Sequence, residues 1–152
     1  MSEIDILDKL NVLERRINEL QRMEHTSTVA RWTDYSAKST IVGWSSFTLK
    51  YLSYCRIGNI VFVAFRLTGI NNSHSVTFTL PYTSAAGGQS QILGRARDNG
   101  GTVASCYGTL DDTGSTVTMY STVTGATWTD SGTKACEGQF WYWCALSEGV
   151  IS

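Results

Sequence analysis

The spacing of apolar residues in the first 25 positions predicts an α-helix with one narrow apolar stripe. The stripe consists of Ile6, Leu10, Leu13, Ile17 and Leu20, which follow one another at alternating steps of four and three residues. This spacing is that of the a and d positions of a heptad repeat. Lys9 and Glu14 then occupy g and e positions, where an ion pair between two chains is expected.

A helix with so little apolar surface has few ways to become stable other than packing against copies of itself. We therefore predict a coiled-coil oligomerisation stalk over residues 1–25. Two alternatives stay open. The helix can instead pack on its own domain, and the mixture of leucine and isoleucine does not decide between a dimer and a trimer.

From Trp32 onward the apolar period changes to two, and short alternating segments are separated by residues typical of turns. The predicted strands are residues 51–56, 60–65, 75–80, 91–97, 102–109, 115–122 and 139–146. Gly58-Asn59 suits a tight hairpin turn between the first two. Short strands at this spacing predict a mainly β head over residues 41–152, an antiparallel β-sandwich of jelly-roll type. Residues 26–40 are then the linker.

Two of these segments are apolar on both faces. Every residue from Ile60 to Phe65 is apolar, and so is nearly every residue from Phe140 to Cys144. A sheet in a sandwich buries only one face within its own domain, so the second face needs another partner. We predict that a neighbouring subunit covers it. The alternative is a pair of central strands covered by long loops.

Composition and charge support this division. The first 25 residues hold 10 of the charged side chains, whereas all 17 aromatic residues lie beyond them. The net charge of -1 argues against a nucleic-acid-binding protein. No apolar run approaches the roughly 20 residues of a transmembrane helix, and the first residues do not resemble a signal peptide. We expect a soluble protein synthesised in a cytoplasm.

The four cysteines are Cys55, Cys106, Cys136 and Cys144, and none of them forms a CxxC pair. The sequence therefore gives no zinc-ribbon or thioredoxin-type signature. Free buried thiols are the expectation without a secretion signal. A Cys136–Cys144 disulfide is the alternative if the protein ends up outside cells.

One stretch of the head resembles a known family. It comprises Tyr54 to Val63, then Gly69, then Thr77 to Tyr82. These segments give a strand, a glycine turn, a strand of alternating valine and aromatic residues, a polar loop and a strand ending in Leu-Pro. This layout resembles the terminal domains of tailed-bacteriophage tail fibres and related receptor-binding proteins, and Trp44 also suits such domains.

The resemblance covers residues 40–85 directly. It implies a homotrimer on a virion, attached to other virion proteins through its N-terminus and to a bacterial surface receptor through its head. The chain is short and lacks the long shaft and anchoring domain of most fibres. That leaves room for a small neck or head fibre or a decoration protein with no receptor role.

The sequence offers little for catalysis. Its two histidines, His25 and His74, accompany no G-x-S-x-G elbow and give no metal-ligand spacing. A glycosidase needs two carboxylates that flank a sugar bond. The acidic residues of the head are Asp34, Asp98, Asp111, Asp112, Asp130, Glu137 and Glu148, and four of these aspartates lie in turn sequences. We predict no enzymatic activity, no metal and no cofactor, with polysaccharide hydrolysis as the alternative.

Carbohydrate binding calls for aromatic faces that stack on sugar rings, beside a few polar side chains that bond hydroxyl groups. The candidate aromatic residues are Trp128, Tyr107 and Tyr120, and the candidate polar residues are Arg95, Arg97, Asp111 and Asp112. Trp141 and Trp143 share one face of a strand, so we assign them to the core or to a subunit interface.

Overall fold

The computed structural model describes residues 9–19, 30–87 and 90–145, and it divides the chain into residues 1–31 and 32–152. In the first unit, residues 9–19 form an α-helix, as predicted. Leu10, Leu13 and Ile17 are exposed on this helix. Ile6 and Leu20 lie outside the described residues, and the association of helices into a coiled coil stays a prediction.

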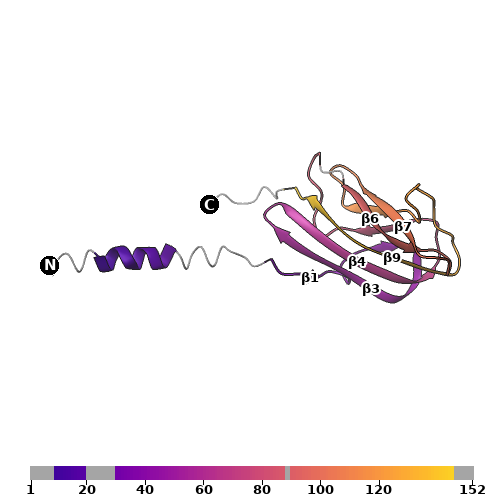
Figure 1. Ribbon diagram of the computed structural model, residues 1–152, viewed down its shortest axis with the longest axis horizontal. Coiled ribbons are helices and arrows are strands. Elements are labelled where there is room, and N and C mark those ends of the chain that lie inside the picture. The colour runs from indigo at the N-terminus through magenta and orange to yellow at the C-terminus, as the bar shows by residue number, and fades with distance from the viewer. Residues whose placement is uncertain (1–8, 20–29, 88–89, 146–152) are drawn as a thin grey trace. The chain divides into compact units, whose positions relative to one another are not determined.

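The second unit, called the head below, is one antiparallel sheet in its described residues (Figure 1). Its strands are β1 (Thr33–Asp34), β2 (Ile41–Val42), β3 (Trp44–Ile57), β4 (Ile60–Asn71), β5 (Val76–Thr79), β6 (Ser90–Arg97), β7 (Ala104–Leu110), β8 (Thr116–Met119) and β9 (Thr133–Trp143). The order across the sheet is β1-β3-β4-β9-β6-β7-β8-β5-β2.

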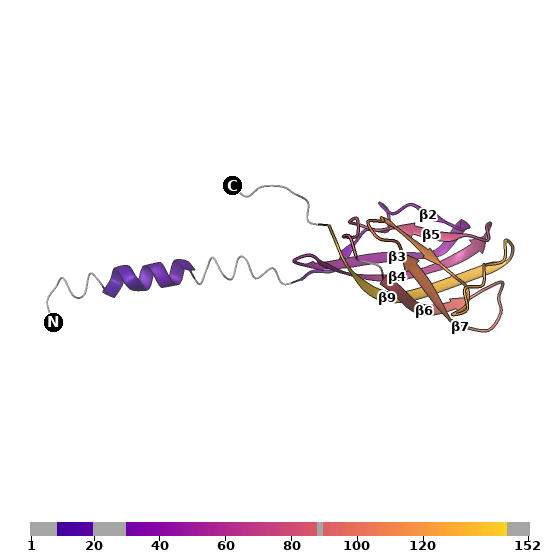
Figure 2. The ribbon, with the colours of Figure 1, turned by 90° about the horizontal axis from the view of Figure 1, so that it is seen from above.

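The predicted mainly β, antiparallel head is confirmed, but the two separate layers of a sandwich are not present among the described strands. The single sheet instead curls into a half-barrel, so that its own inner face encloses the core (Figures 1 and 2). Curling brings strands from distant parts of the sheet across the same core. One sheet can therefore bury its apolar side without a second layer.

Gly43 makes the link between the two sides of the curled sheet. It separates β2, at one margin, from β3, which lies beside the other margin. Its φ is 111°, and a Cβ there would lie 2.7 Å from the Ser75 carbonyl oxygen. Only glycine tolerates both the angle and this close approach. The backbone can therefore pass from one margin to the other within a single residue.

The β3–β4 hairpin forms as predicted across Gly58-Asn59, where Gly58 takes a φ of 60°. The inner face of β4 carries Val61, Val63, Phe65 and Leu67, each at most 2 % exposed. The opposite face of the same strand is outside. An apolar strand thus serves the core with every second residue and leaves the remaining ones to the outer face.

The core reaches further toward the N-terminus than the predicted linker allowed. Within residues 26–40, β1 pairs with β3, and Tyr35 is 4 % exposed in the core. The backbone of Tyr35 also donates a hydrogen bond to the Leu52 carbonyl at 3.0 Å. Residues 32–40 therefore belong to the head, because Tyr35 provides a core side chain in a segment that otherwise reads as polar.

All four cysteines are free and buried, as predicted. Burial raises the pKa of the Cys106 thiol to about 11, and burial also raises the pKa of Cys136. A thiol in such surroundings stays protonated and unreactive at neutral pH. Cys106, Cys136 and Cys144 are small members of the hydrophobic core.

Candidate functional site

The outer face of β3, β4 and β9 carries two exposed tryptophans and two further exposed apolar side chains. Residues directly opposite one another in an antiparallel pair share a face. One row across the three strands is Ile57, Ile60 and Trp143, and the next is Cys55, Phe62 and Trp141. Trp141 is 52 % exposed and Trp143 42 %. We call Ile57, Phe62, Trp141 and Trp143 the apolar patch.

The two tryptophans of the apolar patch lie edge to face, with ring centroids 6.3 Å apart and planes at 84°. They share a face, as the sequence indicated, but they do not belong to the core. Their inward neighbours Phe140 and Tyr142 fill that role, at 8 % and 0 % exposure. Of the two predicted roles, only an interface remains compatible with this exposure.

Farther along the same face, charged residues replace the apolar patch. Tyr51, Arg66, Glu137 and Arg95 form one row across β3, β4, β9 and β6. The carboxylate of Glu137 lies 3.2 Å from Nε of Arg66 and 3.6 Å from Nη1 of Arg95. The row therefore ties three strands together at the surface.

Arg66, Glu137 and Arg95 of this row line a hollow of about 280 Å³. We call it the arginine hollow; its polar lining is Arg66, Thr68, Arg95, Arg97 and Glu137, and Val103 and Ala135 add apolar surface. A second depression of about 510 Å³ adjoins it, and both share Arg66 and Glu137. This tyrosine groove is also lined by Leu49, Tyr51, Ala64 and Gln139.

The structure brings together only part of the predicted binding set. Arg95 and Arg97 both line the arginine hollow. Tyr107 and Tyr120 stack on each other, with centroids 4.8 Å apart and planes at 14°. They lie beside Leu93 on the outer face, because Leu93 pairs with Tyr107.

Asp111 and Asp112 are exposed in the turn that follows β7. Arg95 pairs with Ser105, near the opposite end of that strand. The two aspartates therefore do not share a site with the arginines. Their position matches the turn chemistry of the sequence, since the Asp111 carbonyl accepts hydrogen bonds from the Gly114 amide and the Ser84 hydroxyl.

Trp128 is not available as a surface binding residue. It is 1 % exposed, and its Nε1 donates a hydrogen bond to the Met119 carbonyl at 2.7 Å. That bond satisfies the polar edge of the indole and lets the rest of the ring enter the core. Polar neighbours in the sequence therefore gave the wrong expectation for this residue.

Arg66, Glu137, Tyr51 and Gln139 were not predicted as site residues. Arg66 follows an apolar run and Glu137 precedes another, so each reads as the polar residue that ends a buried segment. What unites them is the register of β3, β4 and β9. The only sequence signal was that these strands expose a second face that needs a partner.

A third depression, of about 270 Å³, lies beside the Leu80-Pro81 segment. Tyr35, Tyr54 and Tyr82 line it, and successive rings meet edge to face at 5.6 Å. Among the described buried side-chain polar atoms, only the Tyr35 hydroxyl lacks a hydrogen-bond partner. Burial raises the pKa of Tyr35 well above its usual value.

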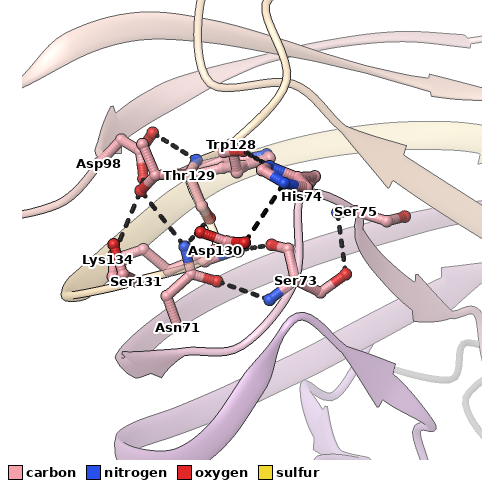
Figure 3. Close-up of polar contacts among 10 residues, drawn as sticks. All are labelled: Asn71, Ser73, His74, Ser75, Asp98, Trp128, Thr129, Asp130, Ser131 and Lys134. Carbon is pink, nitrogen blue, oxygen red and sulfur yellow. Dashed lines mark hydrogen bonds and ion pairs between the residues drawn. The ribbon is translucent and has the colours of Figure 1, made fainter.

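The polar cluster around His74 holds the loop before β9 against the sheet (Figure 3). His74 Nδ1 lies 2.7 Å from the Trp128 carbonyl oxygen, and Nε2 lies 3.4 Å from an Asp130 carboxylate oxygen. The Asp98 carboxylate accepts hydrogen bonds from both the amide and the hydroxyl of Thr129. Both ring nitrogens of His74 face acceptors. The ring therefore has no free nitrogen to activate a serine, and this cluster is not a catalytic triad.

Beneath this cluster lies a buried lysine. Lys134 is 1 % exposed, and its Nζ donates a hydrogen bond to the Ser73 carbonyl at 3.0 Å. The ammonium group also lies 5.3 Å from the Trp44 ring and 5.1 Å from the Trp128 ring. Burial lowers the pKa of Lys134 to about 8, and the nearby Asp98 carboxylate opposes that shift. The two indole faces compensate part of the lost hydration of the cation.

In the part of the chain that the structure describes, no group of histidine, cysteine, aspartate and glutamate side chains has three members placed to hold a metal ion. Within the same residues, no helix has the length and apolarity needed to span a bilayer. No protein-family model, curated protein or solved structure matches this chain.

Proposed function

We propose that this chain is a virion fibre protein of the tailed-bacteriophage kind, a homotrimer whose head attaches to carbohydrate on a bacterial surface without catalysing a reaction. The N-terminal heptads form the stalk in this proposal, and the N-terminus attaches to other virion proteins. The curled antiparallel sheet suits the compact, jelly-roll-like heads of such fibres.

The single observation that carries the proposal is the apolar patch on the outer face of β3, β4 and β9. A solvated sheet face normally carries polar side chains. Here two tryptophans of one strand are 52 % and 42 % exposed beside Ile57 and Phe62. Tryptophan is among the residues most enriched at the energetically dominant positions of protein interfaces. A neighbouring subunit is the simplest partner in a chain that also carries a heptad stripe.

The carbohydrate part of the proposal is supported by the tyrosine groove and the arginine hollow. Tyr51 offers an aromatic face for stacking on a sugar ring, and Gln139 offers a planar amide. The three subunits of a homotrimer would carry one such site each, so avidity for a cell surface can exceed single-site affinity by about a hundredfold or more.

Native mass in solution, measured by light scattering after size exclusion, tests the trimer. We expect about 50 kDa, three times the 16.7 kDa of one chain. The double variant Trp141→Thr, Trp143→Thr should lower the mass toward that of a single chain. Val123→Thr is the matched control, because Val123 is 55 % exposed in a loop outside the apolar patch. A wild-type monomer would overturn the proposal.

A helix variant separates the two sources of association. Leu13→Glu places a charge in the heptad stripe and leaves the head unchanged. If the stalk contributes, this variant also dissociates more readily on dilution. Adhesion of the labelled wild-type protein to bacterial cells then tests the receptor role. A stable trimer that adheres to no host strain would favour the structural virion component instead.

A further inference from the structure

We propose that the arginine hollow binds the oxyanion of an acidic saccharide, a carboxylate or a phosphate ester, and that the tyrosine groove holds the adjoining sugar. This inference rests on the binding role proposed above and names its ligand class.

The arginine hollow carries a net positive charge, whereas the whole chain carries a net negative charge. Arg66, Arg95 and Arg97 line it together with the single carboxylate of Glu137, which leaves a local charge of +2. The whole chain carries a net charge of -1. Such a local excess of cations attracts an anion more strongly than any other ligand class.

Glu137 shapes the hollow instead of neutralising it. Its two carboxylate oxygens separately face Arg66, at 3.2 Å, and Arg95, at 3.6 Å. Each guanidinium has five N–H donors, so donors remain on both arginines for a ligand. Holding the two side chains in place before binding lowers the conformational entropy lost when an anion arrives.

Arg97 has fewer ionic contacts than Arg66 and Arg95. It makes no salt bridge with any acidic residue in the described part of the chain. It lies two residues beyond Arg95 on β6 and therefore points to the same face. A guanidinium in this position can form the paired hydrogen bonds that carboxylates and phosphates accept.

The surroundings favour a saccharide over other anions. The tyrosine groove shares Arg66 and Glu137 with the hollow, so a ligand that fills both is longer than one ion. Tyr51, Leu49 and Ala64 give it apolar surface for the face of a sugar ring, and Gln139 gives hydrogen bonds. The volumes, about 280 and 510 Å³, suit one and a few sugar rings, respectively.

The test is titration of the full-length protein by calorimetry with soluble probes. The probes are a trigalacturonate, a neutral trisaccharide of the same length and a phosphate-substituted oligosaccharide. We expect at least one charged probe to bind about tenfold more tightly than the neutral one. Which one does so identifies the oxyanion. Equal binding of the neutral probe, or no binding of either charged probe, would overturn the inference.

Two competing anions test whether the site recognises the sugar part of the ligand as well as its charge. Inorganic phosphate should displace the saccharide only weakly, because it leaves the tyrosine groove empty. If phosphate alone binds as tightly, the hollow is a general anion site and saccharide recognition is refuted. A single-stranded oligonucleotide that binds more tightly than both charged saccharides would likewise refute it.

Two variants test whether the charged probe binds in the arginine hollow. Arg97→Gln should weaken the charged probe about tenfold and leave the neutral probe unchanged. Lys38→Gln is the matched control, since it removes one exposed cation that lines neither the arginine hollow nor the tyrosine groove. If both variants weaken binding equally, only general charge matters and the assignment fails.

The inference and the proposed function fail in different ways. If the protein forms trimers and adheres to cells but Arg97→Gln adheres as well as wild type, the hollow is not the site and the fibre role stands. If the protein is a monomer that adheres to nothing but still binds the charged probe through Arg97, the fibre role fails and the hollow stands.

Discussion

The outer faces of the two sides of the sheet differ in kind, although their inner faces are alike. On the inside, β4 contributes valine, phenylalanine and leucine, and β5 and β8 contribute Val76, Phe78, Val117 and Met119, each at most 1 % exposed. On the outside, β4 and β9 present Phe62 and Trp141. The outer residues of β5 and β8 are Thr77, Thr79, Thr116 and Thr118, and Thr109 of β7 lies opposite Thr118 on the same face.

The threonines and the tryptophans favour strands equally well but differ in the surface that they expose. Threonine suits a strand because it is β-branched, and its hydroxyl group can bond water. The five threonines therefore form a face that needs no partner. The tryptophans add nothing to strand formation that threonine would not, yet they expose large apolar rings. The difference between the two outer faces thus separates residues that only favour strand formation from residues that also expose apolar surface.

The largest expected effect comes from the inner face. Trp128→Ala should lower the free energy of unfolding by about 3 to 5 kcal/mol, because it leaves a cavity and an unpaired Met119 carbonyl. Trp141→Ala, the same change on the outer face, should cost about 1 kcal/mol or less in the dissociated chain. Urea denaturation at equal chain concentration measures both. Equal losses would mean that the two tryptophans do not differ in burial.

Substitution of Gly43 tests the link between the two sides of the curled sheet. Gly43→Ala should cost about 2 to 3 kcal/mol, because its φ of 111° and the Ser75 carbonyl at 2.7 Å both exclude a side chain. Gly58→Ala is the control. Its φ is 60° and a Cβ there meets nothing within 4 Å, so about 1 kcal/mol is expected. Thermal unfolding of both variants ranks them, and a costlier Gly58 change would contradict the role given to Gly43.

Lys134 distinguishes the inner face under the loop before β9 from the wholly apolar one under β5 and β8. Its pKa falls from 10.5 to about 8 on folding, so between these values the folded chain binds fewer protons than the unfolded chain. The stability of wild type relative to Lys134→Met should therefore rise from pH 8 upward, by at most about 1.4 kcal/mol per pH unit.

Denaturation of both proteins at several values between pH 7 and 9.5 tests this. Comparing the two proteins cancels the titration of cysteines and tyrosines that they share. A stability difference that does not change with pH would show that Lys134 keeps its usual affinity for protons in the fold, and one that falls with pH would show a raised affinity. Either outcome would contradict the prediction.

The smallest changes in stability are expected on the outer faces themselves. Phe62→Thr extends the threonine character onto β4, and should change the unfolding free energy by about 1 kcal/mol or less while weakening self-association about tenfold. Thr118→Ala should change the unfolding free energy by about 0.5 kcal/mol at most and leave association unchanged. Sedimentation across a dilution series compares them. Equal association constants would remove the functional meaning of the contrast.

Local signals made the strands predictable. Apolar patterning located part of each longer strand, and Gly58-Asn59 located the hairpin turn, because both depend only on neighbours in the chain. The strands β3, β4 and β9 extend well beyond the predicted ranges 51–56, 60–65 and 139–146. The apolar character of both faces of residues 60–65 also predicted an apolar outer face on this strand, and Phe62 is 36 % exposed there. The short strands β1 and β2 were missed, since two residues give no period.

The site was less predictable because it depends on register. Arg66 and Glu137 meet only because β4 pairs with β9 in one alignment, and a shift by one residue would point one of them inward. Trp128 illustrates the same limit. Its burial depends on the Met119 carbonyl, which lies on another element and bonds the indole nitrogen. Neither relation leaves a trace in the adjoining residues.

The position of β9 has a consequence for how the head is made. It is the last of the described strands in the chain, yet it lies in the middle of the sheet, between β4 and β6. During synthesis, the β3–β4 hairpin and the β5 to β8 group leave the ribosome first and have no strand to join them. Contacts so distant along the chain are slow to form. A polypeptide interrupted before residue 133 would therefore hold two separate fragments with open edges and neither Trp141 nor Trp143. In the proposed trimer, assembly through that surface would therefore begin only after translation has passed the ninth strand.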